Sequence, residues 1–204
     1  MYIDKIIRKM YNICKKIRQD GQNMYRHCTT EESVLRQRQL EQCLLRIMGE
    51  IPYPQITIGY ICQQADVSRK SFYRYFGSKD DCLHALIDHC ILDGASHYLP
   101  EHNARSAARQ IYVRFFEYWQ QQSLLINALV RNDLSALLVQ RMMVHIDQEE
   151  RDSFNFLSTS STGPYEQIFF MVCGLAGLII QWYTSGFQKS PAQMADILTQ
   201  ITTR

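Results

Sequence analysis

Apolar residues recur every three or four positions along most of the chain, which is the spacing of one face of an α-helix. Early in the chain, Thr29 and Glu32 have the spacing of a capping box, and Gly49 is a typical helix end. The apolar face between them consists of Leu40, Cys43, Leu44, Ile47 and Met48. The same period predicts helices at about 78–99, 103–122, 123–132, 134–157, 164–187 and 190–203. No stretch alternates as a strand does, so the pattern predicts an all-α protein.

The most informative stretch covers residues 57–79 and reads T-I-G-Y-I-C-Q-Q-A-D-V-S-R-K-S-F-Y-R-Y-F-G-S-K. It predicts two short helices around a tight turn, with Ser68 as the N-cap of the second helix. Phe72 and Phe76, four residues apart, would face the core. The opposite, outward face would carry Arg69, Lys70, Tyr73 and Arg74. A basic helix start of this kind suits the major groove of DNA.

Charge supports this interpretation through its distribution. The 204 residues are 46% hydrophobic and 21% charged, as in an ordinary globular protein, and the net charge is only +2. Residues 68–79, however, contain four cations and no acid, and such a local excess favours nucleic acid as a partner. The alternative is that these cations form a solvated face of a helical interaction protein.

The stretch resembles the DNA-binding helix-turn-helix of the tetracycline-repressor (TetR) family of bacterial regulators. It departs from the family pattern at Cys62, usually Ala, at Asp66, usually Gly, and at Lys70, where a small residue is common. Because Asp tolerates left-handed turn geometry better than most residues, we expect the turn to survive. The matching positions are Thr57, Ile61, Ala65, Val67, Ser68, Tyr73, Tyr75, Phe76, Ser78, Lys79 and Leu83.

After an extension at 1–28, the resemblance implies a plan for the rest of the chain: a three-helix DNA-binding head at 29–77, a connecting helix at 78–99 and a helical ligand-binding and dimerisation domain at 100–204. It implies a ligand-responsive repressor that binds a palindromic double-stranded DNA operator as a homodimer. An activator or co-regulator of the same fold, or a dimeric interaction protein that reads no sequence, stays open. The C-terminal part resembles regulators related to those that control dihydroxyacetone kinase, through Gly174, Gly177, Trp182, Gly186, Phe187, Ser190 and Pro191.

The resemblance also assigns DNA contacts to the motif. Thr57, Tyr73 and Lys79 would hold phosphates. At the start of the second motif helix, Ser68 would provide the cap, and the base edges would be met by Arg69, Lys70 and Ser71. Arg74 and Tyr75 would lie at the margin. An arginine fork matches the O6 and N7 acceptors of guanine, which supports this division.

A dimer interface is expected on the last two helices. Small residues at Gly174 and Gly177 would let helix backbones approach closely, with Gln181 and Trp182 beside them. The alternative is that these small residues pack within one protomer. We favour the dimer because two heads read two half-sites.

Residues for an effector pocket are expected in the body and connecting helix. The candidates are His89, Tyr112, Phe116 and Trp119. The predicted helix at 103–122 carries five aromatic residues, and most of them are expected in the core. His89, Asp93 and His97 have a spacing that a metal site could use, but a solvated polar stripe explains them more simply. No metal or cofactor is expected, and the effector is an unidentified small molecule.

The first 28 residues predict a basic amphipathic helix, which is unusual for the family. It could dock onto the body, extend the grip on DNA or lie on an anionic membrane, or translation could begin at Met24. No secretory signal peptide is present, and the longest apolar run, 168–180, is shorter than a membrane span. Seven cysteines without metal or disulfide spacing indicate reduced thiols in a cytoplasmic protein. No catalytic motif is found, so an enzyme is not expected.

Overall fold

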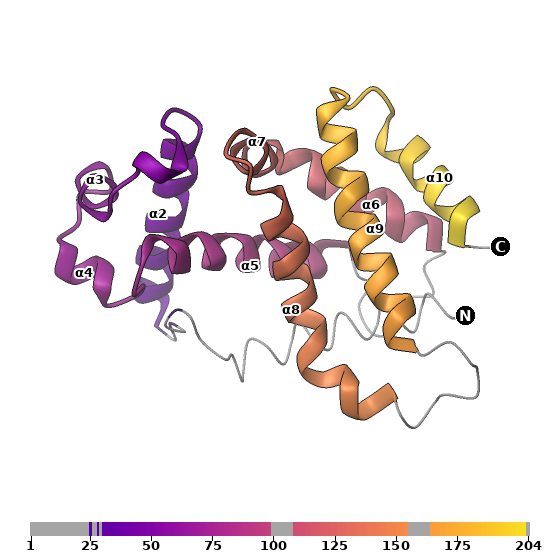
Figure 1. The fold of residues 1–204 in the computed structure, drawn as a ribbon, viewed down its shortest axis with the longest axis horizontal. Helices are drawn as coiled ribbons and strands as arrows, with labels where there is room; N and C mark the ends of the chain where they lie inside the picture. The colour runs from indigo at the N-terminus through magenta and orange to yellow at the C-terminus, as the bar shows by residue number, and fades with distance from the viewer. Residues whose placement is uncertain (1–24, 26–27, 29, 99–107, 155–163, 203–204) are drawn as a thin grey trace.

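The computed structural model is a bundle of helices with a small head at one end and a larger body at the other (Figure 1). It describes residues 25, 28, 30–98, 108–154 and 164–202. Within these residues the secondary structure is helical apart from one isolated bridge between Tyr25 and Phe76, which confirms the all-α prediction. The amphipathic helix expected at 1–28 lies outside the described residues, except for Tyr25 and Cys28.

The elements are α2 (Glu31–Met48), the short 3₁₀ turn η1 (Tyr53–Gln55), α3 (Ile58–Gln64), α4 (Arg69–Tyr73), α5 (Lys79–Tyr98), α6 (Ala108–Gln121), α7 (Ser123–Arg131), α8 (Ser135–Phe154), α9 (Pro164–Thr184) and α10 (Pro191–Thr202).

Hydroxyl side chains start several of these helices. The N-cap of α2 is Thr30, whose Oγ1 accepts from the Ser33 amide at 3.4 Å, and so the predicted cap at Thr29 is wrong by one residue. Ser78 accepts from the Asp81 amide at 3.0 Å, and Ser190 accepts from the Gln193 amide at 3.2 Å. Each bond satisfies an amide that has no partner inside the helix, which fixes where the helix begins.

The head consists of α2, α3 and α4, and α5 leaves it to run into the body (Figure 1). Ile61 of α3 and Phe72 of α4 are fully buried, and Phe76 after α4 is 1% exposed. The rings of Phe72 and Phe76 lie 5.4 Å apart, so the two aromatic residues hold α4 against the rest of the head.

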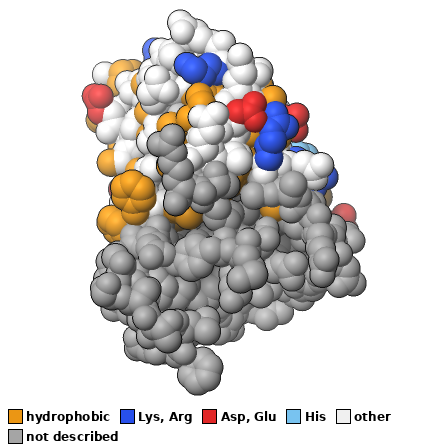
Figure 2. All heavy atoms as spheres, turned by 90° about the vertical axis from the view of Figure 1, so that its right-hand side faces the viewer, with side chains coloured by type: hydrophobic (Ala, Val, Ile, Leu, Met, Phe, Trp, Pro, Cys, Tyr) orange, Lys and Arg blue, Asp and Glu red, His pale blue; other side chains and the backbone are white. Residues whose placement is uncertain are grey.

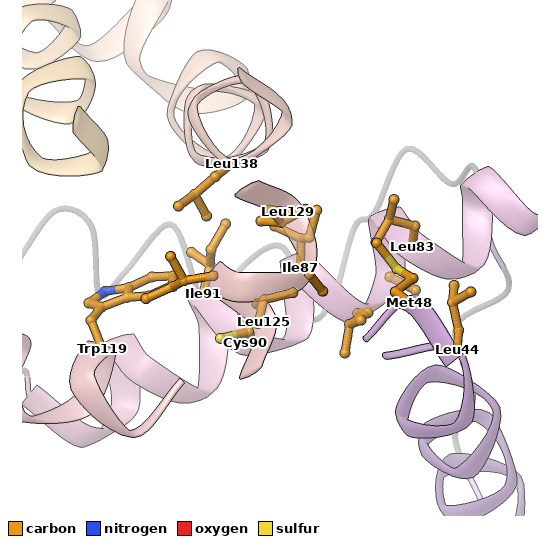
Figure 3. Close-up of a cluster of buried hydrophobic side chains, with 14 of the residues drawn as sticks. Leu44, Met48, Leu83, Ile87, Cys90, Ile91, Trp119, Leu125, Leu129 and Leu138 are labelled. Carbon is orange, nitrogen blue, oxygen red and sulfur yellow. The ribbon is translucent and has the colours of Figure 1, made fainter. Parts of the chain in front are cut away.

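Head and body share a continuous apolar core along α5 (Figure 3). At the head end, Leu44 and Met48 of α2 lie near Leu83 of α5. Further along, Ile87 and Ile91 meet side chains of α6, α7 and α8, among them Trp119, Leu125, Leu129 and Leu138. α5 is therefore buried against both parts, and a displacement of its axis would be felt in each.

The body packs α6 against α10 and α8 against α9 (Figure 1). Its end that turns away from the head carries few charged side chains among the described residues (Figure 2). None of the helices in the described part is both long and apolar enough to cross a membrane.

Candidate nucleic-acid interface

The helix-turn-helix is built from two capped helices and one left-handed turn residue. Thr57 Oγ1 accepts from the Tyr60 amide at 3.2 Å and starts α3, while Ser68 Oγ accepts from the Ser71 amide at 3.1 Å and starts α4. Between them Asp66 has φ 51°, which agrees with the geometry expected where the family has glycine. Ser68 is the cap that the sequence predicts, and Thr57, which the resemblance places at a phosphate, also uses its hydroxyl to cap a helix.

The outward face of α4 is cationic. Arg69, Lys70 and Arg74 are exposed, and the Tyr73 side chain is 56% exposed, while Phe72 between them is fully buried. This is the arrangement that the spacing predicted. The buried ring anchors the helix, and three cations and a phenol are exposed on its other side.

Arg69 has a specific resting position. A Cβ atom added at Gly59 of α3 would lie 2.6 Å from Arg69 Nη2 and 3.4 Å from its Cζ. The guanidinium therefore lies over the first turn of α3, in space that exists because residue 59 has no side chain. This contact holds the arginine near Thr57, beside the surface where the two motif helices meet.

Tyr75 differs from its expected place at the margin of the DNA surface. Its ring is buried, with 4% exposure, and packs near Phe76. Arg74 covers it, with Cζ 5.1 Å from the ring centroid and Nη2 donating to the Tyr75 hydroxyl at 3.2 Å. The tyrosine thus supports Arg74 from beneath, and only Arg74 is presented to solvent.

Lys79 also differs from its expected role. Its ammonium donates to the carbonyl oxygens of Tyr53 at 2.7 Å and of Ile56 at 3.0 Å, with that of Pro54 at 3.5 Å. It also lies 4.4 Å from the centroid of the Tyr53 ring. Because its donors are used within the protein, Lys79 fixes the loop that leads into Thr57 and is not held ready for a phosphate.

A hollow of about 520 Å³ lies between the start of α2 and the motif. From the motif it is lined by Ser68, Ser71, Arg74 and Tyr75, and from α2 by Thr30, Ser33 and Arg36. Sequence reasoning did not connect α2 with this surface, because only the packing of α2 across the motif brings the two segments together.

The residues expected to form an effector pocket fall in two places. Tyr112, Phe116 and Trp119 of α6 are all buried in the core of the body, as most aromatic residues of this helix were expected to be. His89 lies elsewhere, between α5 and α2, where its Nδ1 donates to both carboxylate oxygens of Glu41 at 2.9 Å. His89 therefore joins connecting helix and head.

Trp119 has an unsatisfied group. Its side chain is fully buried, and its indole Nε1 has no hydrogen-bond acceptor among the described residues. Buried donors are nearly always bonded, so this N–H is the strongest polar indication of a bound acceptor in the body.

The polar stripe of α5 does not converge on a metal. His89 is bonded to Glu41, Asp93 accepts from Arg38 Nη2 at 3.0 Å, and the His97 ring lies 5.7 Å from that of Tyr118. In the described part of the chain no group of three or more His, Cys, Asp or Glu residues is placed to hold a metal ion.

The residues expected at the dimer interface lie on α9 but do not share one environment. Gly174, Gly177 and Gln181 are exposed, and a Cβ atom at either glycine would meet nothing within 4 Å. Trp182 does not belong with them. It is 1% exposed, its ring lies 5.4 Å from Phe116 and 4.7 Å from Phe187, and its Nε1 donates to the Lys189 carbonyl. Its indole is part of the protomer core.

Cys43, Cys62, Cys82 and Cys90 are buried, free thiols. Burial raises the pKa of Cys43, Cys62 and Cys82, and raises that of Cys90 to about 12. Thiols held in the neutral form react slowly, so these side chains act as small apolar core residues.

Two family models match parts of the chain. The model described as "Bacterial regulatory proteins, tetR family" matches residues 45–86, and the model described as "Transcriptional regulator C-terminal region" matches residues 107–204. A solved structure, the fatty acid degradation regulator FadR from Bacillus halodurans, is 16% identical with a TM-score of 0.48, over 81% of this chain and 93% of that one. No curated protein matches the chain.

Proposed function

The chain belongs to the TetR family of transcriptional regulators, and from this premise we propose that it is a ligand-responsive repressor that binds a palindromic operator as a homodimer. One observation carries the proposal: the outward face of α4 presents Arg69, Lys70 and Arg74, while Phe72 anchors the same helix in the core. A helix fixed from behind and cationic in front suits a major groove.

The contacts divide by chemistry. Arg69, Lys70 and Ser71, in the first turn of α4, meet base edges, and Arg69 supplies a fork that fits guanine. Thr57 and Tyr73 lie at the edges of the same face and contact phosphates, while Arg74 adds charge at the margin. Lys79 acts indirectly, because it fixes the loop that positions Thr57.

A homodimer through α9 and α10 supplies the second head. Phe170, Gly174, Gly177 and Gln181 follow each other at intervals of four, three and four residues, so they lie on one exposed face of α9, and Phe170 is 74% exposed. Two glycines with open space above them allow a partner helix to approach closely, and the exposed phenylalanine supplies apolar area to bury. A dimer that covers its operator excludes other proteins from that DNA, which is why we propose repression.

A small-molecule effector is proposed for the body because of Trp119. Its buried indole N–H lacks an acceptor among the described residues, and a ligand with a carbonyl, carboxylate or hydroxyl oxygen could provide one. Such a ligand would act on α5, which lies beside Trp119 in the core and carries the head (Figure 3). A shift of α5 would change the spacing of the two heads.

Selection of bound duplexes from a random-sequence library tests the proposal and identifies the operator in the same experiment. We expect enrichment of an inverted repeat whose half-site centres are about 34–36 Å, or a multiple of that, apart. Retention of all sequences alike would favour an interaction protein that reads no sequence. Placement of the selected site in front of a reporter gene then separates repression from activation.

A further inference from the structure

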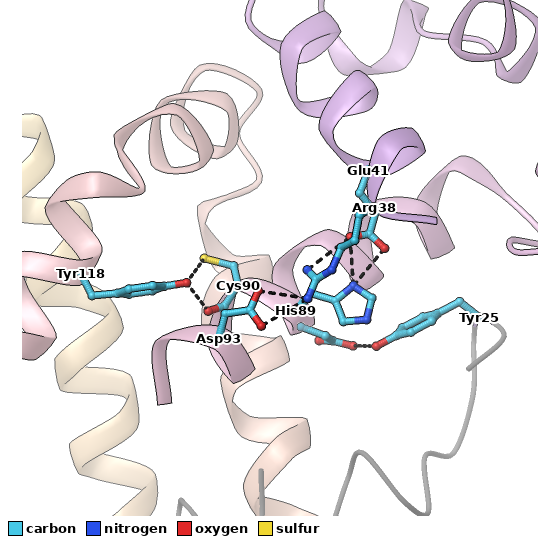
Figure 4. A network of polar contacts seen from close by, with 8 residues as sticks. Tyr25, Arg38, Glu41, His89, Cys90, Asp93 and Tyr118 are labelled. Atoms are coloured by element: carbon cyan, nitrogen blue, oxygen red, sulfur yellow. Dashed lines mark hydrogen bonds and ion pairs between the residues drawn. The ribbon is translucent and has the colours of Figure 1, made fainter. Parts of the chain in front are cut away.

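Tyr25 is the described residue of the N-terminal segment that enters the core. Its side chain is 8% exposed, and its backbone forms an antiparallel bridge with Phe76, directly after the recognition helix α4. Its hydroxyl donates to Asp88 Oδ2 of α5 at 3.0 Å (Figure 4). Tyr25, which precedes α2 in the sequence, thus contacts Phe76 through its backbone and the connecting helix α5 through its side chain.

Asp88 extends this contact to the body. Its carboxylate is 1% exposed and also accepts from Arg141 of α8, with Nε to Oδ1 at 2.7 Å and Nη2 to Oδ2 at 2.5 Å. Arg141 is itself only 8% exposed. Buried charges are stable only when they are paired and hydrogen-bonded. The hydroxyl of Tyr25 and the guanidinium of Arg141 therefore both stabilise the charged form of Asp88.

A second polar group lies against the same tyrosine. The Tyr25 ring makes an edge contact with His89, with centroids 5.7 Å apart, and His89 binds the fully buried Glu41 of α2. Arg38 of α2 pairs with Glu41 at 3.6 Å and with Asp93 of α5 at 3.0 Å (Figure 4). Tyr25 is therefore packed where α2, α5 and α8 are tied together by polar contacts.

We propose that Tyr25, Asp88 and Arg141 form a latch in which Tyr25 holds the residues that follow α4, the connecting helix and α8 in one arrangement. Tyr25 is a positioning residue: it does not face the DNA surface, but it sets how the recognition helix sits on the body. A change at α8 reaches Phe76 through the carboxylate of Asp88 and the hydroxyl and backbone of Tyr25. The latch assigns Tyr25 an intramolecular role, and only its effect on DNA affinity rests on the proposed function.

Amide hydrogen exchange of the full-length Tyr25→Phe variant tests the latch without DNA. The substitution keeps the ring against His89 and removes only the hydroxyl. We expect exchange to speed up about tenfold both at residues 72–78 and in the first turns of α8, since one buried hydrogen bond to a charged group is lost. A purely local packing role for Tyr25 would leave α8 unchanged, and that result would overturn the proposal.

Tyr183→Phe is the matched control. Its hydroxyl donates to Asn127 Oδ1 at 2.8 Å, between α9 and α7, so the control loses a tyrosine hydroxyl bond to a neutral amide outside the latch. We expect its effect to stay within α7 and α9. An equal increase at residues 72–78 in both variants would show general loosening and would contradict the latch.

A DNA arm connects the latch with function. On the duplex selected by the wild-type protein, Tyr25→Phe should weaken binding threefold to tenfold with an unchanged base preference, because the reading face is intact. An unaltered affinity would show that the latch does not position the head. If the wild-type protein selects no sequence, the proposed function fails, while the exchange experiment still decides whether the latch exists.

Discussion

At the scale of single residues, the two buried tryptophans differ in the environment of one atom. Trp182 Nε1 donates to the Lys189 carbonyl at 2.8 Å, whereas Trp119 Nε1 has no acceptor among the described residues. Both indoles are almost completely buried, so replacement by phenylalanine removes similar volume from each site. The difference between the two substitutions therefore reports on the hydrogen bond.

We expect Trp182→Phe to lower the free energy of unfolding by about 1–3 kcal/mol more than Trp119→Phe, because it removes a hydrogen bond, whereas Trp119→Phe removes a buried donor that has no acceptor among the described residues. Urea unfolding of both variants measures this difference. Equal losses would mean that the Trp119 N–H is satisfied by a molecule retained in the purified protein, and mass spectrometry of the denatured sample would then identify that molecule.

Residue partners were the part of the site that the sequence could not supply. The outward direction of Arg69, Lys70 and Arg74 follows from helical period, which is a local property. The partners of Lys79, His89 and Trp182 come from other segments, such as Glu41 for His89 and Phe116 for Trp182, and a period carries no information on them. For that reason the resemblance predicts a phosphate contact for Lys79 and an interface position for Trp182, whereas the structure bonds Lys79 to the loop before α3 and buries Trp182 within the protomer.

At the scale of elements, the turn between α3 and α4 sets the angle of the recognition helix. Asp66 occupies a left-handed conformation, φ 51°, that costs most side chains about 1–2 kcal/mol. Helix bounds were predictable here, because caps, glycines and prolines act within a few residues. The start of α2 was misplaced by one position since two threonines are adjacent and either can cap.

We expect Asp66→Ala to lower the free energy of unfolding by about 1 kcal/mol and Asp66→Gly to change it by less than about 0.5 kcal/mol. Both substitutions remove the carboxylate, so their difference isolates the backbone conformation. Asp133, with φ 57° in the turn after α7, provides the same pair of substitutions away from the DNA surface. No difference between Ala and Gly at either position would refute the strain argument.

At the scale of the whole molecule, the proposed repressor is a homodimer in which the paired bodies hold two DNA-binding heads. In the single protomer, Gly177 is exposed and nothing lies within 4 Å of its Cβ position, so a side chain there starts in open space. A substitution there should therefore leave the protomer folded and act only on association. The family resemblance predicted this face, and the open space above the two glycines is what the structure adds.

We expect Gly177→Glu to raise the dissociation constant of the dimer at least 100-fold, because a carboxylate would be buried against its own copy. Sedimentation equilibrium over a range of protein concentrations measures this. Gln140→Glu, which adds the same charge at an exposed position of α8, should leave the dimer intact. A wild-type protein that is monomeric throughout would contradict the interface itself.

Sequence-selective binding is the central claim, and fluorescence anisotropy on DNA from upstream of the protein's own gene, against scrambled DNA, tests it most directly across about 50–200 mM salt. The account predicts tight, dimer-stoichiometric binding to the first duplex. In the Arg69→Ala variant, the difference in binding free energy between the two duplexes should shrink by about 1–3 kcal/mol. Arg114 is an exposed arginine of α6, and its replacement by alanine should leave this difference unchanged. Sequence-selective binding would be contradicted if the wild-type protein bound both duplexes with equal affinity and also selected no site from a random-sequence library.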